Sequence, residues 1–126
     1  MAKPENKERP LFIYSTAGDW FATKVGNDIF DTTGEWVGFV EGVDVWTAGG
    51  EWIGQLTREG RIVRKRAAPR RPIRTNLPPR PPKPADLPAR APLPPMMAEV
   101  AYDSIDVLEE EPDVFKHISD LRPDMD

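Results

Sequence analysis

A 16-residue repeat occupies the first half of this chain. Trp20, Trp36 and Trp52 are spaced by 16 residues, and six other columns keep the same step. The other columns are Ile13, Ile29 and Val45; Tyr14, Phe30 and Trp46; Gly18, Gly34 and Gly50; Asp19, Glu35 and Glu51; Phe21, Val37 and Ile53; and Ala22, Gly38 and Gly54. A repeat of this length, in register over three copies, constrains the fold more strongly than composition does.

Each copy of the repeat predicts a β-hairpin. In the second copy, Ile29-Phe30 is followed by turn-forming residues that include Gly34, and then by Trp36-Val37. Two runs rich in β-branched and aromatic residues around such a turn are typical of a hairpin and disfavour a helix. After Thr57 the frame shifts by two residues and no fourth tryptophan follows. We therefore predict three hairpins and a final strand near residues 61–65.

The predicted hairpins need a shared core, because a single hairpin is only marginally stable in water. Packing around a common axis buries one ring of side chains and leaves few free edges. The small column suits such an axis, because it lets neighbouring backbones approach closely. The expected fold class is all-β, a shallow pseudo-symmetric barrel of three to four hairpins over residues 10–66.

The Gly-x-Trp-apolar-small motif resembles the petal motif of the 4-fold β-flower family, uncharacterised bacterial barrels of hairpin petals that often carry a Lys/Arg/Pro-rich tail. The resemblance covers about residues 10–66, and residues 64–95 are similar to the tail. The departure is the fourth petal, which lacks the Gly-x-Trp turn and which the strand at residues 10–12 is expected to complete. The family implies no activity. Its likeness to tubby-type barrels, which bind phosphoinositides, is a fold-level analogy that gives anionic lipid as one alternative partner.

Proline dominates the middle of the chain. Eleven of the 15 prolines lie between Pro69 and Pro95. Proline fixes φ and removes backbone donors, so residues 67–98 are predicted to be extended, polyproline-II-like and largely disordered. A second interpretation lays this segment along the barrel, with apolar side chains filling grooves. Those side chains are Ile73, Leu77, Leu87 and Leu93.

The two ends of the chain are predicted separately. Residues 1–9 are expected to be disordered, and residues 99–126 form an acidic tail with one short helix that starts near Pro112. The apolar residues Val114, Phe115, Ile118 and Leu121 share a face of this helix. We expect this face to dock on the barrel in preference to a partner.

Charge is distributed unevenly and bears on the partners. Residues 61–90 hold ten basic residues and one acidic residue, whereas residues 99–126 hold ten acidic and two basic. A protein partner is expected through the Pro-rich or the acidic tail, and the run Pro78–Lys83 fits a P-x-x-P-x-K groove ligand. The basic residues of 61–74 suit anionic lipid. Nucleic acid is an unfavoured partner, because no nucleic-acid-binding signature accompanies the basic run.

The sequence offers little catalytic chemistry. It contains no cysteine and one histidine, His117, which we interpret as a surface residue. The acids Asp19, Glu35 and Glu51, and likewise Asp28 and Asp44, would converge only through pseudo-symmetry, and solvated turn residues are the favoured interpretation. No catalytic residue, metal or cofactor is predicted. No apolar run is long enough to span a membrane and no signal peptide is recognised, so we expect a cytoplasmic location.

The aromatic columns are the candidate binding residues. They are Trp20, Trp36, Trp52, Tyr14, Phe30 and Trp46. Core packing is the favoured interpretation, because a domain of this size needs large side chains to bury enough surface, and an aromatic pocket is the alternative. The expected function is a non-enzymatic binding module with a flexible charged tail. The alternatives are anionic-lipid binding and an enzyme or toxin-like effector.

Overall fold

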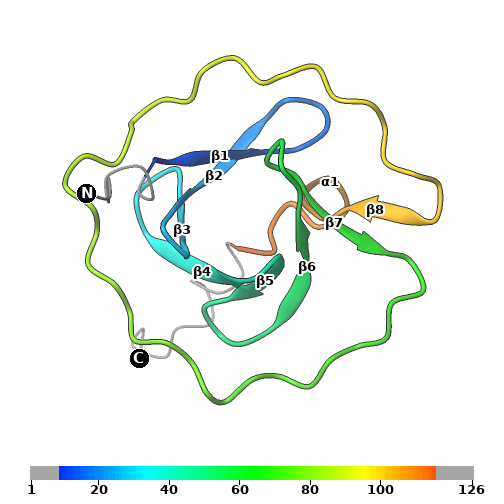
Figure 1. Ribbon diagram of the computed structural model, residues 1–126, viewed down its shortest axis with the longest axis horizontal. Coiled ribbons are helices and arrows are strands. Elements are labelled where there is room, and N and C mark those ends of the chain that lie inside the picture. Colours follow the sequence, from blue (N-terminus) through cyan, green and yellow to red (C-terminus); the bar gives the residue numbers. More distant parts are fainter. Residues whose placement is uncertain (1–8, 116–126) are drawn as a thin grey trace, which may run out of the picture.

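The computed structural model describes residues 9–115, which form one antiparallel sheet of eight strands in chain order. The strands are β1 (Leu11–Tyr14), β2 (Trp20–Val25), β3 (Asp28–Asp31), β4 (Trp36–Glu41), β5 (Asp44–Thr47), β6 (Trp52–Leu56), β7 (Ile62–Lys65) and β8 (Ser104–Asp106), followed by the helix α1 (Val107–Glu110). The sheet curls into a half-barrel, as Figure 1 shows. The predicted all-β fold is confirmed.

The repeat is visible in the strand pairing. In each repeat hairpin the register shifts at the same place, the pair at Ile13/Tyr14 in the first copy and its equivalents 16 and 32 residues later. Such β-bulges increase the local twist of a strand pair. Equal bulges at equal intervals therefore curl the sheet evenly. The three predicted hairpins and the final strand are present.

The hairpin turn occurs four times. In each copy the first residue donates its N–H to the carbonyl four positions on, and a glycine donates back to that first residue. The first residues are Ser15, Asp31, Thr47 and Thr57. The fourth turn joins β6 to β7 and contains Gly60, whose φ of +95° disfavours other residues. The fourth unit therefore keeps the turn, but Arg61 and Ile62 stand where the other units have an acid and a tryptophan.

The core lies on the inner face of the half-barrel. It contains the apolar column Ile13, Ile29 and Val45 together with Val37, Ile53 and Ile62. A Cβ at Gly38 would collide with the carbonyl of Trp46, and one at Gly54 would collide with the carbonyl of Val63. The small column is thus explained by the close approach of the neighbouring strand.

The sheet and core extend beyond the predicted boundary at residue 66. β8 pairs with β7, so the expectation that the strand at residues 10–12 completes the fourth petal is wrong. α1 buries Val107 and Leu108, and Phe115 lies in the same apolar cluster. The helix precedes Pro112, and residues 112–115 form a turn in place of the predicted helix start. Docking on the barrel is confirmed for Val114 and Phe115. The other residues of the predicted helix face, Ile118 and Leu121, as well as His117 and residues 1–8, lie outside the described residues.

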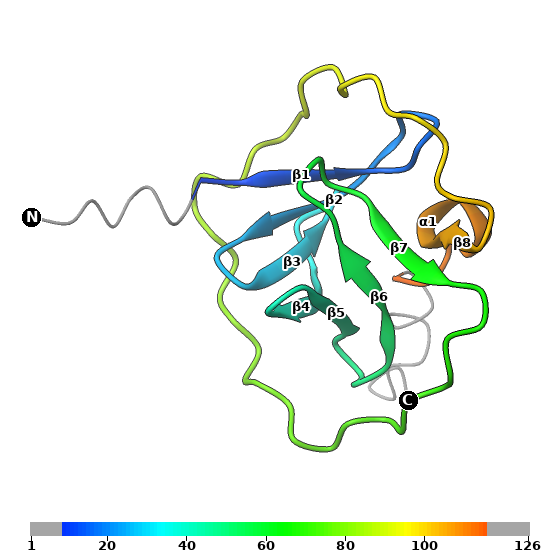
Figure 2. The same cartoon turned by 45° about the vertical axis from the view of Figure 1, so that its right-hand side comes forward.

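Residues 67–101, which we call the belt, run around the outside of the half-barrel without helix or strand, as Figures 1 and 2 show. The belt leaves β7 and returns to β8, where Arg66 N–H donates to the Asp103 carbonyl at 2.8 Å and Lys65 pairs with the Asp103 carboxylate. The predicted disorder of this segment is not confirmed, and its path follows the second interpretation. Of the four apolar residues proposed to fill grooves, Leu87 packs on the barrel, whereas Ile73, Leu77 and Leu93 are exposed.

Candidate functional site

An aromatic cluster covers part of the outer face of the half-barrel. Phe30, Trp36 and Phe39 are buried together, with Trp46 packed against them. Successive residues of a strand point to opposite faces, so Ile29 enters the inner core while Phe30 faces outward. The repeat therefore builds two apolar layers, one inside the sheet and one outside. We call the second layer, together with Trp52 and with Tyr14, the equivalent of Phe30 in the first copy, the outer aromatic face.

The belt lies against the half-barrel with one residue in three, and Leu87 of this row packs on the outer aromatic face. From Pro78 to Val100, half-buried residues recur at steps of three, with a slip of one residue between Leu87 and Pro88, and the residues between them are exposed. The half-buried residues are Pro78, Pro81, Pro84, Leu87, Pro88, Ala91, Pro94, Met97 and Val100. Polyproline II has three residues per turn, so this pattern places one row of a polyproline-like segment against the barrel.

Two arginines of the belt stack on the face. The Arg71 guanidinium lies 4.0 Å from the ring centre of Trp52, and that of Arg74 lies 4.9 Å from Trp46 and 5.2 Å from Phe39. Arg74 also forms a bidentate pair with Glu41, at 2.6 and 3.0 Å. This hydrogen bonding lowers the pKa of Glu41 and raises that of Arg74. The arginines thus combine cation–π contact with ion pairing.

The tyrosine of the first repeat holds the far end of the belt. Tyr14 Oη donates a hydrogen bond of 2.6 Å to the carbonyl of Pro92, and burial raises the pKa of this phenol. Trp20 lies apart from the cluster: its indole meets Phe12 edge-on and donates to the Ala22 carbonyl at 2.9 Å. The polyproline backbone lacks internal hydrogen bonds, so its carbonyls are free to accept from such donors.

The belt also passes the four hairpin turns. Arg74 N–H donates to the Gly50 carbonyl at 2.8 Å, the Lys83 side chain lies over Gly34, and Pro94 lies against Gly18. At the fourth turn the belt is held by Arg61. The belt therefore meets the turns of the third, second, first and fourth units in that order.

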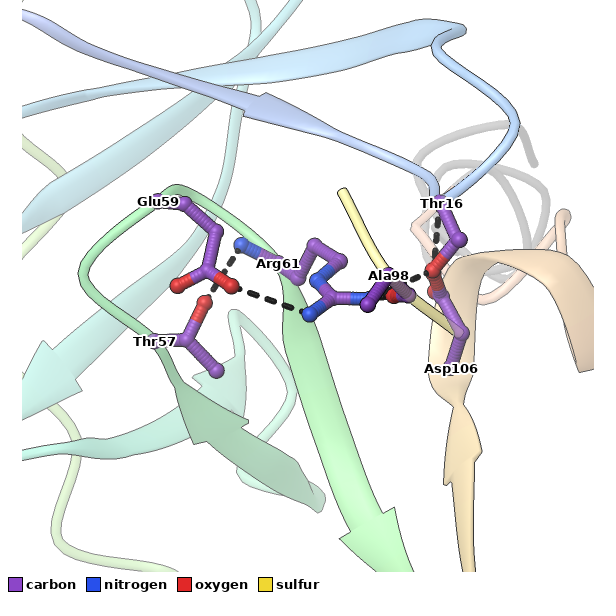
Figure 3. A network of polar contacts seen from close by, with 6 residues as sticks. All are labelled: Thr16, Thr57, Glu59, Arg61, Ala98 and Asp106. Carbon is purple, nitrogen blue, oxygen red and sulfur yellow. Dashed lines mark hydrogen bonds and ion pairs between the residues drawn. The ribbon is translucent and has the colours of Figure 1, made fainter. Parts of the chain in front are cut away.

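Arg61 is the centre of a buried polar network, shown in Figure 3. It donates to the Ala98 carbonyl at 2.6 Å and to Thr16 Oγ1 at 3.0 Å, and it pairs with Glu59 at 2.9 Å. Thr16 in turn donates through its N–H and its hydroxyl to Asp106. Asp106 is 3% exposed and also caps α1 by accepting from Leu108 N–H at 3.1 Å. One side chain thus ties the first turn, the fourth turn, the end of the belt and, through Thr16, the start of α1.

The pKa of Glu59 is lowered by its own backbone N–H first and by Arg61 second. The terminal nitrogens of Arg61 and the carboxylates of Glu59 and Asp106 are held by partners within the network, whereas the buried Nε of Arg61 has no hydrogen-bond partner. This arrangement favours a structural role, as a latch that closes the half-barrel, over a role as a reactive site.

The repeated acids do not converge. Asp19, Glu35 and Glu51 are exposed in separate hairpin turns, as the solvated-turn interpretation expected. Asp44 accepts from Trp52 Nε1 at 3.1 Å and pairs with Arg71 at 3.6 Å. In its equivalent Asp28 the pKa is raised overall, because burial raises it more than the neighbouring Trp36 lowers it. The Trp36 indole N–H itself has no partner at hydrogen-bond geometry. Within residues 9–115, no cluster of His, Cys, Asp or Glu could hold a metal ion.

The surface also carries pockets beside the belt. A pocket of about 510 Å³ lies next to Trp52, between β7 and the start of the belt, and is lined by apolar atoms and by Arg64 and Lys65. A pocket of about 530 Å³ lies between the first turn and α1 and is lined by Glu109 and Glu110 among others. Neither pocket brings the repeat tryptophans together.

The candidate residues of the sequence therefore fall into two groups. Phe30, Trp36 and Trp46 meet in the outer aromatic face, with Trp52 and Tyr14 at its ends, whereas Trp20 lies apart. The residues of the outer aromatic face are covered by the chain's own belt and do not line an open pocket. Sequence reasoning placed Arg61, Arg71 and Arg74 in a lipid-binding run and missed their contacts with the barrel, although the substitution of arginine for an acid at Arg61 was a signal at the break in the repeat.

No family model, curated protein or solved structure matches this chain. Among the described residues, no helix is long and apolar enough to cross a membrane.

Proposed function

We propose that the protein is a non-enzymatic interaction module, in which the half-barrel displays a basic, proline-rich belt to a protein partner. The observation that carries the proposal is the belt's burial pattern. One row of residues contacts the barrel and the other two rows are exposed, including Pro79, Arg80 and Pro82. A segment held in this way is extended in advance, which lowers the entropic cost of binding a partner.

The cations of the belt fall into two classes. Arg71 and Arg74 are paired with barrel carboxylates, whereas Arg70, Arg80 and Arg90 are exposed and make no ion pair within the described chain. The unpaired arginines suit a partner that presents acidic side chains. The P-x-x-P-x-K motif is less suited to a groove-type domain, because its prolines Pro78 and Pro81 face the barrel.

A comparison of two variants tests the proposal. The belt variant replaces Arg70, Arg80 and Arg90 by serine, and the matched control replaces Lys24 and Arg58, two cations of the barrel, by serine. We expect proteins captured from the host extract by the wild type to be retained by the control and lost by the belt variant. If all three forms capture the same proteins, the belt is not the binding surface. If none of them captures a protein at low salt, the proposal of an interaction module is wrong.

The two alternatives from the sequence stay predictions. Anionic lipid was expected to bind the basic residues of 61–74, but Arg61, Arg64 and Lys65 are each paired with a carboxylate. Sedimentation with anionic vesicles at low salt tests that idea directly. An enzyme or toxin-like effector needs converging reactive groups, and the exposed repeat acids give it no support. Membership of the β-flower family is likewise a proposal, supported by the repeat hairpins.

A further inference from the structure

The belt shows which ligand chemistry the outer aromatic face accepts. Five of the nine residues in its inward row are prolines, and Leu87 of the same row packs on the cluster of Phe30, Trp36 and Phe39. Flat aromatic rings that contact prolines, together with a hydroxyl that donates to a free carbonyl, are the means by which grooves bind polyproline II. Tyr14 supplies that hydroxyl, at 2.6 Å from the Pro92 carbonyl.

Charge adds selectivity to this face. Arg71 and Arg74 are three residues apart, so polyproline II geometry puts them on one row. Arg71 stacks on Trp52 and pairs with Asp44, and Arg74 stacks on Trp46 and pairs with Glu41. Each arginine thus meets an aromatic ring and a carboxylate of the barrel, and both rings belong to the third copy of the repeat. The matching signature in a ligand is Arg-x-x-Arg joined to prolines at three-residue steps.

The belt is held on the face without being part of the core. Its large side chains at Leu93 and Met96 are 92% and 100% exposed. The belt's two ends are joined at the base by the bond from Arg66 N–H to the Asp103 carbonyl, which leaves β7 and β8 paired whatever the path of the belt between them. A loop much longer than this junction requires is unusual and commonly functional. Release of the belt would uncover the face while the sheet remains intact.

We propose that the outer aromatic face is a binding site for arginine-bearing polyproline II segments, and that such a segment of a partner protein replaces the belt, the site's resident ligand. This inference rests on the proposed function and adds a second binding surface to it. The belt and the partner segment compete for one site. The belt has the advantage of a high effective concentration, because it is tethered.

Titration of a fluorescent synthetic peptide with the sequence of residues 69–98 tests the proposal. The peptide is added to the full chain, to a belt-loosened variant (R74S/L87S) and to the same variant carrying Glu41→Gln on the face. We expect the loosened variant to bind at least about tenfold more tightly than the wild type, because the tethered competitor is weakened. Glu41→Gln should then reduce the affinity about three- to tenfold, because a carboxylate that accepts two charged hydrogen bonds is lost.

Two control peptides define the chemistry. One has Arg71 and Arg74 replaced by serine, and the other has the inward prolines replaced by alanine; both should bind at least about tenfold more weakly, since each removes one of the two recognised features. Near-ultraviolet circular dichroism reports whether each variant is folded, and Leu87→Ser alone serves if the double variant is not. A folded loosened variant that binds no more tightly than the wild type, or that binds the peptide lacking the inward prolines equally well, overturns the proposal. The belt variant, in which Arg70, Arg80 and Arg90 are replaced by serine, separates the two proposals. It should lose the captured partners, whereas the affinity of the outer aromatic face for the peptide should stay unchanged.

Discussion

Replacing Arg61 by methionine should open the latch of the half-barrel. The change keeps much of the side chain's apolar length and removes three charged contacts, to Ala98, Thr16 and Glu59. Hydrogen bonds to charged groups contribute about 1.5–3 kcal/mol each when buried. The pair with Glu59 counts for less, because that carboxylate is 39% exposed and its interaction is screened by solvent. Asp106 keeps its bonds from Thr16 and from Leu108 N–H, so no buried carboxylate is left alone.

We therefore expect Arg61→Met to lower the free energy of unfolding by about 2–4 kcal/mol. Urea unfolding followed by tryptophan fluorescence measures this loss. With a slope of about 1–2 kcal/mol per molar urea for a small domain, the midpoint should fall by roughly 1–4 M. The matched control is Arg66→Met, which removes an exposed arginine bonded to a single carbonyl, that of Tyr102, and should cost less than about 1 kcal/mol. Equal losses in the two variants would refute the idea that Arg61 is a latch.

Three further predictions concern the turns, the equivalent acids and the core. Gly50→Ala should lower the free energy of unfolding in urea more than Gly26→Ala does. Both glycines have positive φ, but a Cβ at position 50 would also collide with the backbone of the belt. Equal losses in the two variants would contradict the docked belt. Asp28→Asn should stabilise at pH 7 and Asp44→Asn should destabilise, because burial raises the pKa of Asp28, whereas Asp44 is paired with a cation and an indole. Because the pKa of Asp28 is higher in the folded than in the unfolded state, its ionisation costs stability above the folded-state pKa and costs nothing below the unfolded-state pKa. The gain from Asp28→Asn should therefore vanish below about pH 4. A gain that persists below that pH would be inconsistent with this reasoning. Phe115→Ala should cost about 3–5 kcal/mol by thermal or urea unfolding, as removal of a buried ring does, and a loss below 1 kcal/mol would mean that residue 115 is not part of the core.

The predictable part of the fold follows from local pattern. Ile29 and Phe30 are neighbours in the sequence, and strand alternation sends one to the inner core and the other to the outer face. The turn glycines and the following tryptophans could be placed for the same reason, because a hairpin is made by residues close together in the chain. Whether the aromatic column was core or pocket could not be decided locally. The answer depends on what covers the outer face, and the cover is a segment far along the chain.

The sequence by itself determined the hairpins, their number and the two faces of each strand, since these depend on spacings of two and 16 residues. Only the tertiary structure decided the path of the belt, the completion of the core by β8, α1 and Phe115, and the role of Arg61. These features depend on contacts between residues such as Thr16 and Asp106, which are 90 positions apart. Contacts of that kind leave no periodic trace in a single sequence, because each is made once, by one pair of side chains. The repeat therefore specified a curled sheet with an aromatic outer surface, and the unrepeated half of the chain decided what that surface holds.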